Sequence, residues 1–240
     1  MKVLIRRVIR SLGFDLRRYN PACSQAAQLM QICSIQDVNL VFDVGANTGQ
    51  FGSYLREAGY RGRIISFEPL TSARQQLMLA RKNDPFWEVA PQAALGDEDG
   101  EIVIHVAGNS VSSSVLNMLD SHTRAAPESA YISSERVPLR RLDTLAPEYL
   151  RASSNLFVKI DTQGYEDRVL DGASEVLPHV SVLQLELSLV PLYEGQRLFD
   201  EMISKLKTYG FELWAISPVL IDTQTGRLLQ IDATLCASNK

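Results

Sequence analysis

The chain has 240 residues, 45% hydrophobic and 22% charged, a composition that suits one α/β domain or two small ones with a well-formed core. The formal net charge of -4 argues against a dedicated nucleic-acid-binding protein, and no apolar run reaches the roughly 20 residues of a membrane-spanning helix. The three cysteines form no CxxC pair and the first 20 residues contain no apolar signal-peptide core, so we expect a cytoplasmic protein.

Positive charge is concentrated at the start of the chain. Residues 1–20 hold six Lys and Arg side chains against one Asp, which gives this segment +5 and leaves -9 for the other 220 residues. Apolar residues recur at roughly helical spacing over residues 1–12 and again over 24–35. We therefore predict that residues 1–37 form a basic, helical N-terminal extension.

From residue 38 onward, short apolar runs alternate with helical patterns. Strands are predicted at 39–43, 63–67, 87–90, 101–106, 136–141, 156–160, 180–187, 211–216 and 228–235, and helices at 51–58, 72–82, 142–150, 166–170 and 198–209. This alternation predicts an α/β fold with a mostly parallel sheet and helices on both faces. The strand at 136–141 is expected at an edge, and the last two strands are expected to form an antiparallel pair.

The sharpest motif follows the first of these strands and opens a helix. It is Asp-Val-Gly-Ala-Asn-Thr-Gly-Gln-Phe over residues 43–51. Glycines at 45 and 49 permit a tight turn and the close approach of a ligand. Glu68 ends the next strand, where an acidic side chain can accept two hydrogen bonds from a ribose. Together these features predict a nucleotide-type site.

Two common phosphate-binding patterns do not fit this turn. A P-loop requires Lys after its last glycine, but Gln50 follows Gly49, and a GxGxxG motif would need glycines where Asn47 and Gln50 stand. An acid at Asp43 is also unsuited to a pyrophosphate and suits a ligand that carries a positive group. The turn therefore favours S-adenosylmethionine, with its ammonium and sulfonium groups, over a nicotinamide cofactor.

Six segments together resemble the FkbM family of S-adenosylmethionine-dependent methyltransferases. They are Val-Phe-Asp-Val-Gly-Ala-Asn-Thr-Gly (41–49), Ser-Phe-Glu-Pro (66–69), Ala-Ala-Leu-Gly-Asp (93–97), Ser-Ser-Ser (112–114), Val-Lys-Ile-Asp-Thr-Gln-Gly-Tyr-Glu (158–166) and Leu-Glu-Leu-Ser-Leu (185–189). The resemblance implies a Rossmann-like class I methyltransferase fold with a seven-stranded sheet and a catalytic domain over residues 38–240. It also implies methylation of sugar hydroxyls in glycans, glycolipids or glycosylated natural products.

The resemblance assigns roles to residues of this chain as well. Asp43 and Gly45 would line the methionine part of the donor, and Glu68 would hold its ribose. Ala94 and Leu95 would border the adenine together with Gly96. The full set of expected donor-binding residues is Asp43, Gly45, Ala46, Asn47, Gly49, Phe51, Glu68, Pro69, Ala94, Leu95 and Asp161.

Methyl transfer to an alcohol needs an aligned nucleophile and a group that takes its proton. Asp161, at the end of a central strand, is the first candidate base, although an N-cap for the following helix is an alternative role. Glu186 is a second carboxylate expected to face the cleft. No metal site is predicted, although Asp161 and Glu186 have the chemistry to share a divalent ion. The expected catalytic residues are Asp161, Glu186 and Gln163, and the expected substrate-binding residues are Ser112, Ser113, Gln163 and Glu166.

Three other side chains invite a weaker functional interpretation. Lys159 interrupts an apolar strand, and we expect it at an edge of the sheet or with its amine reaching solvent. His105 is expected to be structural. His122 lies in a polar segment, where it is a minor candidate for a base carried by a lid.

The leading hypothesis is an S-adenosylmethionine-dependent O-methyltransferase with a sugar-containing acceptor and no nucleic-acid partner. The alternatives are a nicotinamide-dependent oxidoreductase and a non-catalytic donor-binding module. The basic residues 1–18 admit two interpretations. They suit a peripheral contact with the inner face of an anionic membrane, and they also suit packing on the domain or at a homodimer interface, which is the favoured interpretation.

Overall fold

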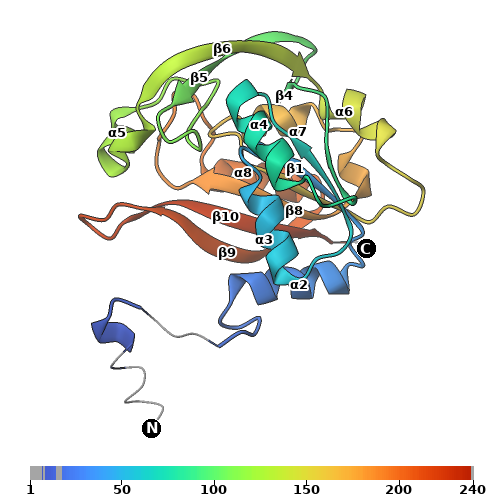
Figure 1. Cartoon of the computed structure of the whole chain (residues 1–240), viewed down its shortest axis with the longest axis horizontal. Helices are drawn as coiled ribbons and strands as arrows, with labels where there is room; N and C mark the ends of the chain where they lie inside the picture. The colour runs from blue at the N-terminus through green and yellow to red at the C-terminus, as the bar shows by residue number, and fades with distance from the viewer. Residues whose placement is uncertain (1–6, 8, 15–17, 239–240) are drawn as a thin grey trace.

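The computed structural model describes residues 7, 9–14 and 18–238, and its centre is a seven-stranded sheet (Figure 1). The strand order is β3-β2-β1-β7-β8-β10-β9. The strands are β1 (Leu40–Val44), β2 (Arg63–Phe67), β3 (Trp87–Val89), β7 (Leu156–Ile160), β8 (Val180–Ser188), β9 (Phe211–Ile221) and β10 (Leu228–Ala237). Strand β10 is antiparallel to both of its neighbours, whereas the pairs from β3 to β8 are parallel. The predicted fold class is thereby confirmed.

Helices cover both faces of this sheet, and each face has its own apolar core. On one face, α2 (Gln25–Ile35), α3 (Gln50–Ala58) and α4 (Thr71–Ala80) pack against side chains such as Val41 and Phe157. On the other face, α6 (Leu142–Leu145), α7 (Glu166–Asp171) and α8 (Phe199–Thr208) pack against side chains such as Phe42 and Val158. Neighbouring residues of one strand thus serve opposite faces, which explains why the central strands are continuously apolar.

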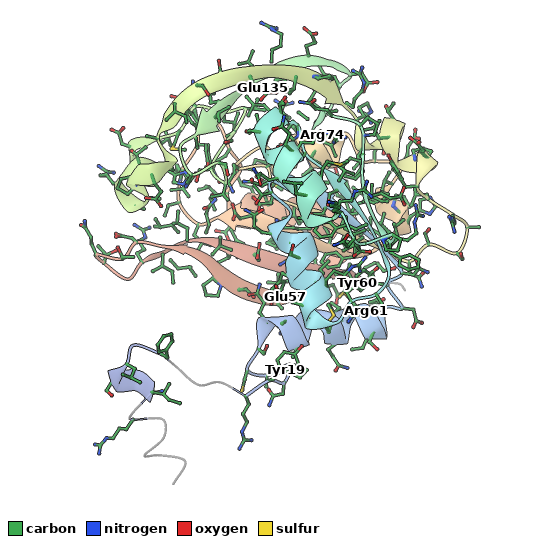
Figure 2. All side chains as sticks on the ribbon, in the orientation of Figure 1. Tyr19, Glu57, Tyr60, Arg61, Arg74 and Glu135 are labelled. Carbon is green, nitrogen blue, oxygen red and sulfur yellow. The ribbon has the colours of Figure 1, made fainter. Side chains whose placement is uncertain are left out.

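A second, three-stranded sheet lies over the carboxyl ends of the main strands (Figure 1). It has the order β4-β6-β5, with β4 (Ala94–Leu95), β5 (Gly100–Ala107) and β6 (Tyr131–Arg140). The prediction of an edge strand at 136–141 is wrong, because β6 is the middle strand of this sheet. The Glu135 carboxylate of β6 accepts hydrogen bonds from the backbone N–H and hydroxyl of Thr71, which ties the second sheet to α4 (Figure 2).

The segment between β5 and β6 contains the short helix α5 (Asp120–Ala125) and the 3-10 helix η1 (Pro127–Ser129). It packs against a small apolar cluster that includes Tyr193 and Leu229. The predicted helix over residues 1–12 and the membrane contact of residues 1–18 lie largely outside the described residues. No helix within the described ranges is long and apolar enough to cross a membrane.

Candidate functional site

The glycine turn after β1 brings two strand ends into contact. Gly45 has φ +75°, and a Cβ atom there would lie 1.8 Å from the backbone carbonyl oxygen of Asp161. Only glycine permits this approach of the β1 end to the β7 end. Gly49 has φ +90° and is the N-cap of α3. A Cβ atom there would contact the side chains of Leu77 and Trp87.

Three non-glycine residues with left-handed backbones surround this turn. Asn47 has φ 46°, Ser110 has φ 59° and Gln163 has φ 56°. The Asn47 side-chain amide donates to the Ser110 hydroxyl at 3.2 Å and so joins the turn to the loop after β5. Such backbones cost about 1–3 kcal/mol each and cluster at functional sites.

Glu68 follows β2 and is almost completely buried. Its two carboxylate oxygens accept hydrogen bonds from the backbone N–H groups of Asn47 at 2.7 Å and Leu70 at 2.8 Å. Burial raises the pKa of Glu68 to about 7, and the two backbone donors oppose that rise. These bonds fix the carboxylate while each oxygen retains a lone pair for a hydroxyl group.

These features border a pocket that we call the glycine-turn pocket. It holds about 620 Å³ of space, including the part open to solvent. The apolar side chains Leu70, Ala94 and Leu95 come from the segment after β2 and from β4. Asp161 and Gln163 follow β7, on the other side of β1, and form what we call the polar end. Its remaining lining residues are Val44, Gly45, Asn47, Phe67, Glu68, Pro69, Ala93, Ile104, Ser110, Val111, Ser113, Ser114, Val115, Thr162 and Tyr165.

An ion pair anchors the polar end of this pocket. Lys159 of β7 donates to Asp161 at 2.7 Å, and its ammonium lies 5.2 Å from the ring centre of Phe51. The neighbouring carboxylates raise the pKa of Lys159 against the effect of its burial, so the ammonium is charged. Lys159 is buried in a central strand, and the predicted place at an edge or in solvent is wrong.

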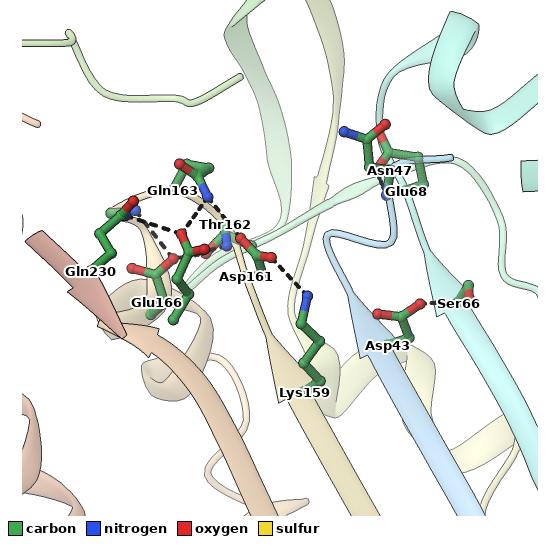
Figure 3. Close-up of polar contacts among 12 residues, drawn as sticks. Asp43, Asn47, Ser66, Glu68, Lys159, Asp161, Thr162, Gln163, Glu166 and Gln230 are labelled. Carbon is green, nitrogen blue, oxygen red and sulfur yellow. Dashed lines mark hydrogen bonds and ion pairs between the residues drawn. The ribbon is translucent and has the colours of Figure 1, made fainter. Parts of the chain in front are cut away.

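Asp43 behaves differently from the other acids at this edge. Figure 3 shows its carboxylate turned toward Ser66, which donates to it at 3.1 Å. It is fully buried, its Oδ1 atom has no hydrogen-bond partner, and it does not line the glycine-turn pocket. Burial raises the pKa of Asp43 to about 6 despite the nearby Lys159. Asp43 therefore supports the base of the site and lies behind the expected ligand wall.

Gln163 is the centre of a polar network (Figure 3). Its amide nitrogen donates to Asp161 at 2.8 Å and to Glu186, and its amide oxygen accepts from the Tyr193 hydroxyl at 2.6 Å. Gln230 of β10 donates to the same Glu186 oxygen at 3.0 Å. The network fixes Gln163 between the ends of β7 and β8.

A second pocket, which we call the carboxylate pocket, adjoins the first along the sheet edge. It holds about 970 Å³, again including space open to solvent. Its lining residues are Gly45, Ala46, Asn47, Gln50, Phe51, Asn109, Val111, Ser112, His122, Ala126, Glu128, Lys159, Asp161, Gln163, Glu186, Val219, Leu220 and Gln230. The two pockets have Gly45, Asn47, Val111, Asp161 and Gln163 in common.

The structure divides the sequence-predicted residues between these pockets. Those that line the glycine-turn pocket are Gly45, Asn47, Glu68, Pro69, Ala94, Leu95, Ser113, Asp161 and Gln163, and those found in the carboxylate pocket alone are Ala46, Phe51, Ser112 and Glu186. Asp43, Gly49 and Glu166 line neither pocket.

The Glu166 carboxylate holds the turn after β7. Its Oε1 atom accepts hydrogen bonds from the backbone N–H of Thr162 at 2.8 Å and of Gly164 at 3.1 Å. Burial raises its pKa to about 7. The alternative role of Asp161 as an N-cap is not realised, because the N-cap of α7 is Tyr165.

Several pocket residues had no clear signal in the sequence. Val219, Leu220 and Gln230 come from the C-terminal strands, whose alternating pattern predicted only a closing pair. His122 is buried in α5, and burial lowers its pKa to about 4, so it is a neutral side chain of the pocket wall and not a mobile base. Within the described residues, no group of three or more His, Cys, Asp or Glu side chains is arranged to hold a metal ion.

Comparison with known proteins adds one match in sequence. The model of the methyltransferase FkbM domain matches residues 43–213. No curated protein sequence matches the chain.

Solved structures give looser matches in fold. A methyltransferase FkbM from Methylobacillus flagellatus KT is 14% identical, with 82% of this chain and 44% of that chain covered and a TM-score of 0.48. The 1,6-didemethyltoxoflavin-N1-methyltransferase of Burkholderia thailandensis gives 11% identity, 90% and 80% coverage and a TM-score of 0.45. TrmK of M. capricolum is 8% identical, with 89% of this chain and 68% of that chain covered and a TM-score of 0.47. This chain thus spans less than half of the first of these proteins, and the family assignment rests on the sequence match.

Proposed function

The chain belongs to the FkbM family of S-adenosylmethionine-dependent methyltransferases, and we propose that it methylates a hydroxyl group of a sugar-containing acceptor. When bound, the donor supplies an activated methyl group on a sulfonium centre. The protein must therefore hold the donor, align the acceptor oxygen and accept the proton that this oxygen loses.

The glycine-turn pocket fits the donor in its shape and its chemistry. Gly45 leaves open a space that a Cβ atom would close. Glu68 is a fixed carboxylate that suits the two hydroxyls of a ribose. Leu70, Ala94 and Leu95 form an apolar end suited to a flat base. We place the methyl group at the opposite, polar end, beside Asp161 and Gln163.

The observation that carries this proposal is that the two pockets meet at Asp161 and Gln163. An acceptor in the carboxylate pocket reaches the end of a donor in the glycine-turn pocket without crossing the chain. Lys159 holds the Asp161 side chain and the Tyr193 hydroxyl holds the Gln163 side chain. These contacts favour a fixed geometry for an in-line displacement. Polar side chains of the carboxylate pocket such as Asn109, Ser112 and Gln230 favour an acceptor rich in hydroxyl groups.

The donor is tested by comparing thermal unfolding with S-adenosylhomocysteine and with NAD. A ligand present at a concentration of 100 times its Kd adds about 2.7 kcal/mol to the free energy of unfolding. For a chain of this size, that corresponds to a rise in Tm of roughly 5–10 °C. We expect this rise with S-adenosylhomocysteine and none with NAD. A rise with NAD alone would support the oxidoreductase and reject the proposal.

Turnover is tested with radiolabelled S-adenosylmethionine and a panel of glycans, glycolipids and free glycosides. Label recovered as a methyl ether supports O-methylation of a sugar. Donor binding without label transfer to any hydroxyl compound would favour the non-catalytic module.

A further inference from the structure

We propose that the carboxylate pocket is the acceptor site for a neutral polyhydroxyl group such as a sugar ring, and that Glu186 takes the proton of the methylated hydroxyl. This inference deepens the proposed methyl transfer and rests on it. Three properties of the pocket carry it, namely its charge, the free oxygen of Glu186 and the unpartnered side chain of His122.

The pocket lining lacks an unpaired cation within the described part of the chain. Lys159 is the one Lys or Arg among the lining residues, and its ammonium is bound to Asp161. His122 is neutral because its pKa is lowered to about 4 by burial. Glu128 and Glu186 add carboxyl groups. A phosphate or carboxylate group would meet only an ammonium already paired with Asp161 and would face the carboxyl groups of Glu128 and Glu186, whereas hydroxyl groups can donate to these oxygens.

The geometry of Glu186 leaves one oxygen available. Gln163 and Gln230 both donate to Oε2, and in the described residues no hydrogen bond reaches Oε1. The residue lies at the end of β8 and lines the carboxylate pocket. Asp161, the first candidate base, has both oxygens engaged, one by Lys159 and one by Gln163. Of the two candidate bases Asp161 and Glu186, only Glu186 thus has a carboxylate oxygen that accepts no hydrogen bond within the described residues.

The surroundings of Glu186 make its carboxylate a stronger proton acceptor than that of an exposed glutamate. Burial raises its pKa well above the usual value for a glutamate, and the carboxylates of Asp161, Asp232 and Glu166 raise it further. Lys159 lowers it. His122 and Glu128 are the other titratable groups of the pocket wall. A carboxylate with a raised pKa is a stronger proton acceptor than an ordinary one.

An unpartnered polar side chain also marks this pocket as a binding site. The His122 ring is 2% exposed, its Nδ1 atom has no hydrogen-bond partner, and the residue lines the pocket. Its ring packs edge-on against Tyr193, whose hydroxyl holds Gln163. In a neutral histidine, Nδ1 is a donor in one tautomer and an acceptor in the other. Because a sugar hydroxyl can both donate and accept, it can pair with His122 Nδ1 in either tautomer after a small rotation of the imidazole ring. The apolar side chains of Val219 and Leu220 offer contact to the carbon atoms of the ring.

The proposed step is balanced as follows. The acceptor oxygen forms a bond to the methyl carbon, and the carbon–sulfur bond breaks with its electron pair remaining on sulfur. The hydroxyl proton passes to Glu186 Oε1 and later to solvent. The products are a methyl ether and S-adenosylhomocysteine, and the carboxylate returns to its starting state.

The proton role is tested with Glu186→Gln, which keeps the side-chain shape but cannot take a proton. For a methylated sugar from the panel, we expect kcat to fall by at least about 100-fold, while KM for the sugar and Kd for S-adenosylhomocysteine change less than threefold. The wild-type rate should rise with pH through the raised pKa of Glu186, and this rise should vanish in the variant. The control is Glu57→Gln on the exposed side of α3 (Figure 2).

A kcat above one tenth of the wild-type value, or an unchanged pH profile, would overturn the proton role. If S-adenosylhomocysteine binds but no hydroxyl compound is methylated, the proposed function fails instead, and the proton role fails with it. The two failures are therefore distinct.

The acceptor pocket is tested without turnover, in the complex with S-adenosylhomocysteine. Saturation-transfer NMR should detect neutral methyl pyranosides of glucose and rhamnose, and a methyl glucuronide should bind at least tenfold more weakly. Val219→Trp at the half-exposed rim should abolish the sugar signal and leave the Kd of S-adenosylhomocysteine unchanged. No sugar signal, tighter binding of the glucuronide, or an unaffected signal in the variant would each refute the assignment of the pocket.

Discussion

Replacing Glu166 with Gln tests the role of the buried carboxylate below the β7 turn. The amide oxygen of Gln can accept the bonds from Thr162 and Gly164 that Glu166 Oε1 accepts now. The change removes only the ability to ionise. Because burial raises the pKa of Glu166 from 4.5 to about 7, the folded protein holds this proton more tightly than the unfolded chain does. The stability that Glu166 contributes is therefore present at low pH and is lost as pH rises from 4.5 through 7.

The magnitude follows from that shift. One pKa unit corresponds to about 1.4 kcal/mol, so ionisation of Glu166 costs the folded state roughly 3 kcal/mol at pH 8 and less than about 1 kcal/mol at pH 5. We therefore expect the free energy of unfolding of Glu166→Gln, measured relative to that of the wild type, to be about 2–3 kcal/mol more favourable at pH 8 than at pH 5.

Urea unfolding at pH 5 and pH 8 measures this gain, with the exposed Glu175→Gln as the matched control. A gain that is the same at both pH values, or a loss that grows with pH, would refute the reasoning. Since Glu166 lines neither pocket, the KM of the acceptor should not change, and an increase would restore it as a substrate-binding residue.

Three further predictions concern the same sheet edge. Lys159→Met should destabilise the fold by about 3–5 kcal/mol in urea unfolding, because it leaves the buried end of Asp161 without its ammonium partner. Gly45→Ala should lower the free energy of unfolding by at least about 3 kcal/mol, and unchanged stability would contradict the close approach of β1 and β7. Its control is Gly226→Ala, where φ is similar but the space is open, and the loss there should be only about 1–2 kcal/mol. Glu68→Gln should weaken S-adenosylhomocysteine at least tenfold in calorimetric titration, and an unchanged Kd would remove Glu68 from the ribose site.

The central strands were predictable because each is buried on both faces. The central strands β1, β2, β7 and β8 are therefore recognisable as continuous apolar runs. Three acids at or near the ends of β2, β7 and β8, namely Glu68, Asp161 and Glu186, line the pockets. By contrast, β6 alternates apolar and polar residues, and that pattern does not tell which sheet a strand joins. This is why the second sheet could not be foreseen.

The motifs alone do not give the direction of each side chain. Asp43 lies inside β1 and its carboxylate contacts Ser66 of β2, whereas Gly45 follows the end of β1 with φ +75° and lines the pocket. Lys159 was expected at an edge because one of its carboxylate neighbours, Asp43, comes beside it only when β1 and β7 pair. Gln230 could not be assigned to the site from the sequence, because its hydrogen bond to Glu186 joins the antiparallel strands β10 and β8.

The hairpin of β9 and β10 has a consequence for how such an enzyme can change. The family match ends at residue 213, so Val219, Leu220 and Gln230 lie beyond the stretch that marks the chain as a methyltransferase. Donor chemistry and this wall of the carboxylate pocket thus occupy separable parts of the chain. Exchanging the hairpin between homologues is accordingly a direct way to retarget the enzyme, since it alters the wall while the glycine turn and Glu68 stay intact.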